Sequence, residues 1–357
     1  MGAPTAALGA SGPWLFSRRL DLAAFLGSAL LSLLLVALGI PLGLVDGEGA
    51  ESETPEWAWL FVVVAVDVAH VWGNLLLVYT DPVEFRRHRR LWLFLPVSVF
   101  VLGLALVSEG EVLFWRALAA LAVWHFVRQQ VGWLKLYRAK NGELSGPRWT
   151  RIVDEGVVYG ATLAPIVWWH ANLPRPFWWL APGDFFVALP HEAGSVALAA
   201  EALVLLAYLG RSAAAWRQKR GNPGKDILVG TTALLWWLGI VALQSDYAFT
   251  VTNVLIHGIP YAVLIAVTAQ RRERAGVSIA WPLRHGAAVI IIALLFCAGV
   301  EEVLWDRLVW NERSWLDFLP AIEWARPFFV ALLALPQATH YLLDAFLWRR
   351  RGNPYLV

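Results

Sequence analysis

Residues 56–79, EWAWLFVVVAVDVAHVWGNLLLVY, decide the fold of this chain. At a rise of about 1.5 Å per residue, a helix of this length crosses the roughly 30 Å of hydrocarbon in a bilayer. Three polar side chains interrupt the apolar run, namely Asp67, His70 and Asn74. Their spacings place them on one face of a helix. The stretch therefore predicts a transmembrane helix whose polar face contacts other helices and not lipid.

The composition of the whole chain agrees with a membrane location. Of 357 residues, 59% are hydrophobic and only 16% are charged, against about 25% charged residues in an average soluble domain. A soluble core of this size needs a polar surface that these residues cannot provide. The single cysteine, Cys297, excludes an intrachain disulfide. We expect an integral membrane protein with no nucleic-acid partner.

Nine further apolar stretches are long enough to cross a membrane. We predict an all-α fold, a polytopic transmembrane bundle of about ten helices that forms a single domain over residues 1–357. The predicted spans lie near 20–45, 56–79, 91–108, 111–137, 152–170, 192–210, 226–245, 247–270, 285–305 and 326–348. Residues 174–190 are also apolar, but their prolines favour an interfacial or re-entrant segment over a span.

The distribution of charge predicts the orientation. With ten spans, 23 of the 29 Lys and Arg residues fall on the side of the two termini, in the segments 18–19, 86–90, 135–151, 211–225, 271–284 and 349–351. The loops on the other side are acidic, with Asp46, Glu48, Glu51, Glu53, Asp317 and Glu323 among their residues. Basic loops stay in the cytoplasm. We therefore expect both termini in the cytoplasm of a bacterium, an inner-membrane location, and contacts between the basic loops and anionic headgroups.

Ionisable residues inside five of the predicted spans form a polar layer. His70, His125, His257 and His340 lie in the second, fourth, eighth and tenth spans, and Glu201 lies in the sixth. These helices all run in the same direction, and the four histidines are expected within about 8 Å of one another in depth, in the cytoplasmic half. Each histidine has a polar residue four positions later, and two have one before it on the same face. These partners are Asn74, Gln129, Tyr261 and Asp344 after the histidines, and Asp67 and Asn253 before them.

Such a layer is typical of an intramembrane metal site. Neutral imidazole is a common ligand of iron, copper and zinc, and charged or polar groups within spans are by default functional. The predicted ligands of the transition metal are His70, His125, His257, His340 and Asp344. We expect iron or copper ahead of zinc, and haem less than any of these. The predicted hydrogen-bond partners of the ligands, or members of a proton relay, are Asp67, Asn74, Gln129, Glu201, Asn253 and Tyr261.

A metal buried below the membrane surface favours a hydrophobic substrate. We expect a metal-dependent membrane oxidoreductase, similar to an oxygenase, that acts on a lipid and exchanges electrons with a redox partner. Three alternatives remain open. The layer could serve as the proton relay of a transporter or channel, it could provide interhelical hydrogen bonds alone, or a histidine could act as the base in acyl transfer.

Three short segments carry a resemblance to other proteins. They are DVAHVWGNLLLVYTDPVEFRRHRR at 67–90, WHFVRQQVGW at 124–133 and HYLLDAFLWRR at 340–350. Together they resemble a set of uncharacterised bacterial polytopic membrane proteins that end in an HYxxDxxIWR-like motif. The resemblance implies that His70, His125, His340 and Asp344 are signature positions. It implies no named activity.

Overall fold

The computed structural model describes residues 12–45, 54–276, 285–316 and 325–348. Within these ranges the chain is helical and forms no strand, which confirms the all-α prediction. Some of the charged residues that predict the orientation lie outside the described residues. They are Asp46, Glu48, Glu51, Glu53, Arg284, Asp317, Glu323 and Arg349 to Arg351.

Eight helices are long and apolar enough to cross a bilayer. They span Arg18–Gly39 (α1, η1 and α2), Glu56–Thr80 (α3, η3 and α4), Arg89–Glu109 (α6), His191–Arg217 (α9), Pro223–Ala242 (α10 and η5), Asp246–Arg274 (α11), Ala288–Trp310 (most of α13, and η6) and Arg326–Leu347 (α14 and α15). Eight such helices indicate a helical membrane protein.

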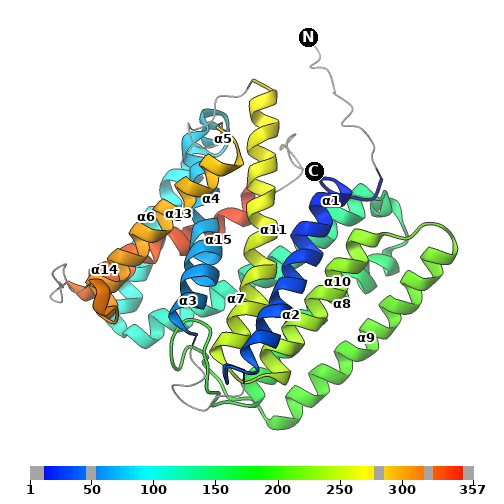
Figure 1. The fold of residues 1–357 in the computed structure, drawn as a ribbon, viewed down its shortest axis with the longest axis horizontal. Helices are drawn as coiled ribbons and strands as arrows, with labels where there is room; N and C mark the ends of the chain where they lie inside the picture. Colours follow the sequence, from blue (N-terminus) through cyan, green and yellow to red (C-terminus); the bar gives the residue numbers. More distant parts are fainter. Residues whose placement is uncertain (1–11, 46–53, 277–284, 317–324, 349–357) are drawn as a thin grey trace.

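Two more long helices lie between the third and fourth of these. They are α7 (Glu111–Lys140) and α8 (Arg148–Ala171), which coincide with the fourth and fifth predicted spans. Both are long enough to cross a bilayer, but polar side chains lower their hydropathy. These include His125 and Arg128 on α7 and Asp154 on α8. Both helices pack within the bundle (Figure 1).

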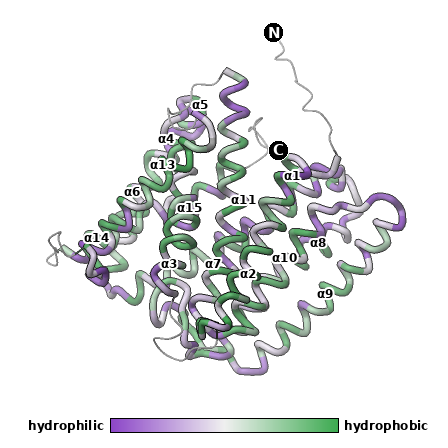
Figure 2. Tube along the Cα trace, in the orientation of Figure 1, coloured by the Kyte–Doolittle hydropathy of each residue, from purple (hydrophilic) through white to green (hydrophobic). Residues whose placement is uncertain are grey.

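The bundle is organised around α11, whose residues are mostly buried. It packs against α2, η3, α4, η5 and α7, whereas α9 packs on α8 at the outer edge of the bundle (Figure 1). Large apolar side chains point outward from the peripheral helices, for example Leu203 on α9 at 69% exposed and Phe296 on α13 at 71%. Figure 2 shows long hydrophobic stretches in α9, with hydrophilic residues at the turn between α9 and α10. This outer surface suits contact with lipid chains.

Two of the long helices are irregular close to their polar residues. Residues Trp59–Val68 form a π-helical segment, η3, that continues into α4 (Ala69–Thr80). The last stretch is divided at Ala334 into α14 (Arg326–Leu333) and α15 (Leu335–Leu347). Pro336 follows the break, and its ring provides no backbone N–H. Such interruptions of regular helix are frequent at functional sites.

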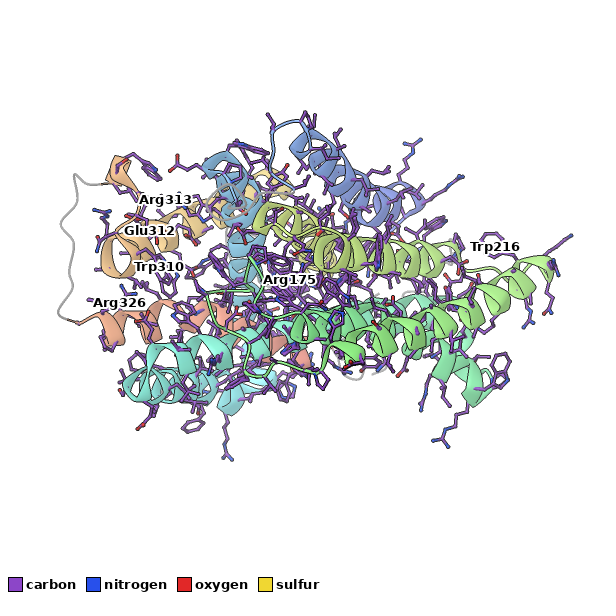
Figure 3. All side chains as sticks on the ribbon, turned by 90° about the horizontal axis from the view of Figure 1, so that it is seen from below. Arg175, Trp216, Trp310, Glu312, Arg313 and Arg326 are labelled. Carbon is purple, nitrogen blue, oxygen red and sulfur yellow. The ribbon has the colours of Figure 1, made fainter. Side chains whose placement is uncertain are left out.

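Ion pairs connect several helix ends at the end of the bundle that contains α3. Arg313, after η6, lies 3.2 Å from Glu56 at the start of α3, and Arg326, at the start of α14, lies 2.9 Å from Glu111 at the start of α7. Figure 3 shows Arg313 and Arg326 on the same side of the bundle. Segments far apart in sequence therefore share one end of the molecule.

The segment between α8 and α9 is not a helix, as its prolines predict. The Asp184 carboxylate accepts backbone N–H groups from Trp179 and Leu180 at 2.9 and 2.7 Å, which closes a compact loop. The Arg175 guanidinium stacks over the Trp168 ring at 4.6 Å and donates to the carbonyl of Ile240 at 3.0 Å. Burial lowers the pKa of Arg175 to about 10. In Figure 3 this arginine lies near the centre of the bundle.

Candidate metal centre

Four buried imidazoles from four different helices meet in the interior of the bundle. They belong to His70 on α4, His125 on α7, His257 on α11 and His340 on α15, and each residue is at most 2% exposed. One ring nitrogen of each lies within 4.8 Å of one ring nitrogen of every other. These four residues are the histidine cluster.

The four rings form a closed circuit. The ring centroids of His70 and His257 are 4.8 Å apart, and those of His257 and His125 are 5.0 Å apart. The circuit continues from His125 to His340 at 4.7 Å and returns to His70 at 4.8 Å. The neighbouring ring planes are inclined by 64° to 82°. Each ring therefore has two neighbours in the cluster at nearly equal distances.

Half of the eight ring nitrogens have no hydrogen-bond partner among the described residues. Nδ1 of His70 lies 3.2 Å from the Val66 carbonyl, and its Nε2 lies 3.1 Å from Nε2 of His257. In the part of the chain that the structure describes, the buried nitrogens without a partner are Nε2 of His125, Nδ1 of His257 and both nitrogens of His340. Leaving a buried polar atom unpaired costs about 1–3 kcal/mol. Four such atoms therefore gather in this buried cluster, on three of its histidines.

Asp344 lies beside the cluster and accepts hydrogen bonds from three side chains. Its Oδ1 is 2.5 Å from the amide nitrogen of Asn74, 2.6 Å from the hydroxyl of Tyr261 and 3.0 Å from the indole nitrogen of Trp348. The amide of Asn74 also donates to the Tyr261 hydroxyl at 3.0 Å. These contacts fix the carboxylate with side chains from α4, α11 and the end of α15.

Carboxylates lie behind three of the four rings. Asp344 is 3.7 Å from Nδ1 of His125 and 4.0 Å from Nδ1 of His340. On the other side of the cluster, Asp67 is 3.6 Å from Nδ1 of His70. A carboxylate behind Nδ1 leaves Nε2 as the nitrogen that faces the centre, an arrangement common around metal-bound histidines.

Three other predicted residues lie farther from the histidine rings. Gln129 lines the cavity described below, and neither polar atom of its amide has a hydrogen-bond partner among the described residues. Asn253 faces η5, where its amide nitrogen lies 3.0 Å from the position of a Cβ at Gly239. Glu201 on α9 packs against Gly160 of α8. The structure thus brings Asn74, Tyr261, Asp67 and Asp344 to the cluster, but not Asn253 or Glu201.

Sequence reasoning missed three aromatic residues at this site. The ring of Phe126 stacks on His257 at 3.7 Å, and Tyr341 stacks on His125 at 4.7 Å. Both directly follow a histidine of the cluster, but in a chain with 13% aromatic residues this adjacency carries no signal. Trp348 follows the predicted aspartate by four residues, and this step could have identified it.

A cavity of about 1100 Å³ opens beside the cluster, between α7, α8, α11 and α15. His125, Tyr341 and Asp344 line its inner wall. Along α7 the lining extends from Ala120 to Ala139, a rise of about 28 Å. Most of the other lining side chains are apolar. The cavity therefore connects the cluster with a long, mainly apolar groove.

A network of buried charges lies beside the groove, where Arg138 forms part of its lining. The Asp154 carboxylate lies 3.0 Å from Nε of Arg138 and 3.4 Å from Nζ of Lys225, and it also pairs with Arg211. Lys225 donates in addition to Glu143, in the turn between α7 and α8. Burial raises the pKa of the Glu143 carboxyl, but its hydrogen bond to Lys225 and the charge of that lysine more than offset this, so the pKa lies below its usual value. These pairs hold α7, α8, α9 and α10 together.

No protein-family model matches this chain, and no curated protein and no solved structure is similar to it. Its function therefore has to be inferred from the histidine cluster and the groups around it.

Proposed function

We propose that the histidine cluster binds a transition metal ion and that the protein is a membrane oxidoreductase acting on a lipid or another hydrophobic substrate. The observation that carries this proposal is the closed circuit of four buried imidazoles with unpaired nitrogens. Imidazole nitrogens favour iron, copper and zinc over magnesium or calcium. Because the proposed chemistry is redox, iron or copper is preferred to zinc.

The distances in the cluster fit a single ion. Two nitrogen ligands at about 2.0–2.1 Å from a metal lie roughly 2.9–3.4 Å apart when they subtend about 90–110°. The Nε2 atoms of His70 and His257 are 3.1 Å apart, within this range. Two ligand atoms on opposite sides of one ion lie about 4.1 Å apart. The ring nitrogens of the cluster are up to 4.8 Å apart, so the largest separation has to shorten by about 0.7 Å for all four to bind one ion. Rotation of the side chains provides such a change.

The same distances argue against haem. A porphyrin needs a flat gap between its two axial ligands, wide enough for the macrocycle. Every ring in the cluster has two neighbours whose centroids are at most 5.0 Å away. The neighbours would occupy the plane of the macrocycle, so bare metal coordination fits better.

The surrounding residues have defined tasks in this proposal. A bound iron or copper ion would supply electron transfer and oxygen activation. The carboxylates of Asp67 and Asp344 orient the rings and stabilise the positive charge of the ion. Asp344 lies close enough to His125 and His340 to become a ligand after a small shift. The aromatic rings of Phe126 and Tyr341 pack against the cluster and exclude water.

We further propose that α7 and α8 also cross the membrane, which gives ten spans with both termini in the cytoplasm. The ion pairs support this topology. Arg313 with Glu56 joins two predicted external segments. Arg272 on α11 pairs with Asp81 and Glu84, which joins two predicted cytoplasmic segments. Lys225, at the start of α10, pairs with Glu143, which joins the turn between α7 and α8 to another predicted cytoplasmic segment. Basic side chains at the cytoplasmic end would contact anionic headgroups of a bacterial inner membrane.

Cysteine labelling tests this topology. Replacing Cys297 by alanine provides a background without other thiols. A thiol reagent that does not cross membranes should label Arg313→Cys in intact spheroplasts and should label Arg148→Cys, at the start of α8, only after permeabilisation. Labelling of Arg313→Cys only after permeabilisation would overturn the orientation.

Elemental analysis of the protein purified in mild detergent tests the metal. We expect about one equivalent of iron or copper, with a second ion as the upper limit, and a spectrum that changes when dithionite is added. Oxygen uptake that depends on an added bacterial lipid extract and a reductant would then support the oxidoreductase. A monodisperse sample without metal above background would overturn the metal site.

One observation favours a second function, the proton relay of a transporter or channel. Asp67 and Asp344 flank the cluster on opposite sides, one toward the start of α4 and the other toward the end of α15. Carboxylates and imidazoles in such an order are able to pass protons. Ion flux in proteoliposomes by a metal-free protein would favour the relay, whereas lipid-dependent oxygen uptake without flux would favour the enzyme and its redox partner.

A further inference from the structure

One arginine in the cavity has no carboxylate partner. Arg128 lies one helical turn after His125 on α7 and lines the cavity. Its Nη1 donates to the hydroxyl of Tyr159 at 2.6 Å. Throughout residues 12–45, 54–276, 285–316 and 325–348, no carboxylate lies within ion-pair distance of this guanidinium. Its positive charge therefore has no counter-ion within the described structure.

The other cations that line the cavity are compensated. Arg138 pairs with Asp154 at 3.0 Å. Lys135 and Arg151 lie 3.8 and 4.0 Å from Glu155. Arg128 thus differs from its neighbours in lacking a carboxylate partner, although it lies farther from the end of α7; its side chain is exposed to the cavity. From Arg128 to the end of α7 there are twelve residues, about 18 Å along the helix axis.

Two further groups beside Arg128 are available to a ligand. Gln129 lines the same cavity, and both of its buried amide atoms lack a partner among the described residues. The Tyr159 hydroxyl is already held by the guanidinium and can donate its own proton. The nearby Asp344 carboxylate does not serve Arg128, because Asn74, Tyr261 and Trp348 already donate to it.

These groups specify an anion of a particular size and shape. A charge within a bilayer is costly without an opposite charge beside it. The planar guanidinium binds a carboxylate through two parallel hydrogen bonds. Arg128 lies about 14 Å along α7 from the end of the predicted span at residue 137, too far from the interface for the phosphate of a bilayer phospholipid. A molecule with a single carboxylate and one hydrocarbon chain is smaller, because it lacks the phosphate headgroup and the second chain of such a lipid.

We propose that Arg128, with Gln129 and Tyr159, binds the carboxylate of a long-chain carboxylic acid. The hydrocarbon chain lies toward Val123, Trp124 and Leu163, the uncharged part of the cavity lining. Trp124 and Leu163 are 41% and 43% exposed, so this part of the cavity opens sideways toward lipid.

The site would bring a particular part of the ligand to the histidine cluster. The rise from Arg128 back to His125 is about 4.5 Å, so the carbon atoms nearest the carboxylate pass beside the His125 ring. That this acid is the substrate rests on the proposed function, whereas its binding depends only on the cavity. The two ideas can therefore fail separately.

Binding of radiolabelled palmitate to the full-length protein in phosphatidylcholine nanodiscs tests this proposal, with empty discs as the background. Arg128→Gln should bind palmitate at least about 10-fold more weakly, because it loses a charge-assisted pair. The matched control is Arg148→Gln, an exposed arginine on α8 outside the cavity lining, which should bind like the wild type. Equal binding by Arg128→Gln and the wild type would overturn the proposal.

Competition on the wild-type protein gives a second readout that needs no variant. Unlabelled palmitic acid should displace the label at least about 10-fold better than its methyl ester, which lacks the charge. Displacement by the ester or by phosphatidic acid as good as that by palmitate would overturn a carboxylate site. Metal content is measured on the same samples. Metal without palmitate binding would refute this inference alone, and palmitate binding without metal would refute only the proposed function.

Discussion

The Nε2 atoms of His70 and His257 lie 3.1 Å apart, although 187 positions separate the two residues in the chain. Two neutral imidazoles at this distance share one proton at most, and the same separation suits two ligands of one metal ion. The flanking nitrogens are compatible with the second use. Nδ1 of His70 faces a backbone carbonyl, while Nδ1 of His257 has no partner among the described residues.

Replacing His257 by alanine should therefore reduce the metal content by about 10-fold or more. Metal affinity falls by this much even when the substitution removes only a residue that hydrogen-bonds to a ligand. Elemental analysis of the purified variant measures this. His170→Ala is the matched control, because His170 lies outside the cluster, with its ring stacked on Phe185. Wild-type metal content in His257→Ala would remove this residue from the site.

The helix pattern was predictable, because each of the ten apolar stretches overlaps a long helix in the structure, although the first helix ends at Gly39 and not near residue 45. Hydropathy and length suffice for this, since a long helix in lipid must satisfy its own backbone hydrogen bonds. The convergence of His70, His125, His257 and His340 was also expected from their similar depth. Which helices are neighbours was not predictable, because helix packing depends on side-chain shapes.

Glu201 illustrates the limit of reasoning from depth. The sequence places it with the histidines, because it lies in a span of the same direction, but α9 packs at the edge of the bundle, on α8 (Figure 1). The sequence predicts how deep a residue lies in the membrane, but it does not predict the position of its helix within the membrane plane. Asn253 shows a similar limit. It precedes His257 by four residues, yet it faces η5, because Gly239 allows that segment to approach closely.

Asp344→Asn should lower the metal content by about 10-fold or more while the protein still folds. Asparagine keeps the size of the side chain but removes the charge that faces His125 and His340. Metal content and elution on size exclusion are the two measurements. Asp226→Asn is the matched control, since Asp226 also accepts from a tyrosine and a tryptophan but lies on α10 away from the cluster. An unchanged metal content in Asp344→Asn would exclude a role for this carboxylate.

Gly239→Ala should destabilise the protein by about 1–3 kcal/mol, as overpacking of a filled core does. A Cβ at this position would lie 1.9 Å from Oγ1 of Thr252, so either η5 or α11 has to move. The midpoint of thermal unfolding in detergent measures the effect. Gly230→Ala, on α10, is the control, because a Cβ there meets no atom within 4 Å. An unfolding midpoint for Gly239→Ala equal to that of the control would show that these helices are not tightly packed.

Glu143→Gln should destabilise the protein in a way that depends on pH. The carboxylate accepts a hydrogen bond from Asn222 at 2.8 Å and pairs with Lys225. Burial raises the pKa of this carboxyl, but the lysine outweighs burial and holds the pKa below its usual value. Because the pKa is lower in the folded protein, the pair stabilises the fold above the unfolded-state pKa of about 4.3. This stabilisation is lost as the pH falls through the folded-state pKa.

The variant should therefore be about 1.5–3 kcal/mol less stable than the wild type at pH 7, the loss expected for a hydrogen bond to a charged group. The difference should remain constant down to about pH 5 and vanish at lower pH, where the wild-type carboxyl is also protonated. Glu273→Gln is the control, since Glu273 is exposed at the end of α11, and it should match the wild type throughout. Unfolding midpoints measured between pH 3 and pH 8 decide the matter. A difference that grows toward low pH would mean that the pKa of Glu143 is raised in the folded protein and that burial outweighs Lys225.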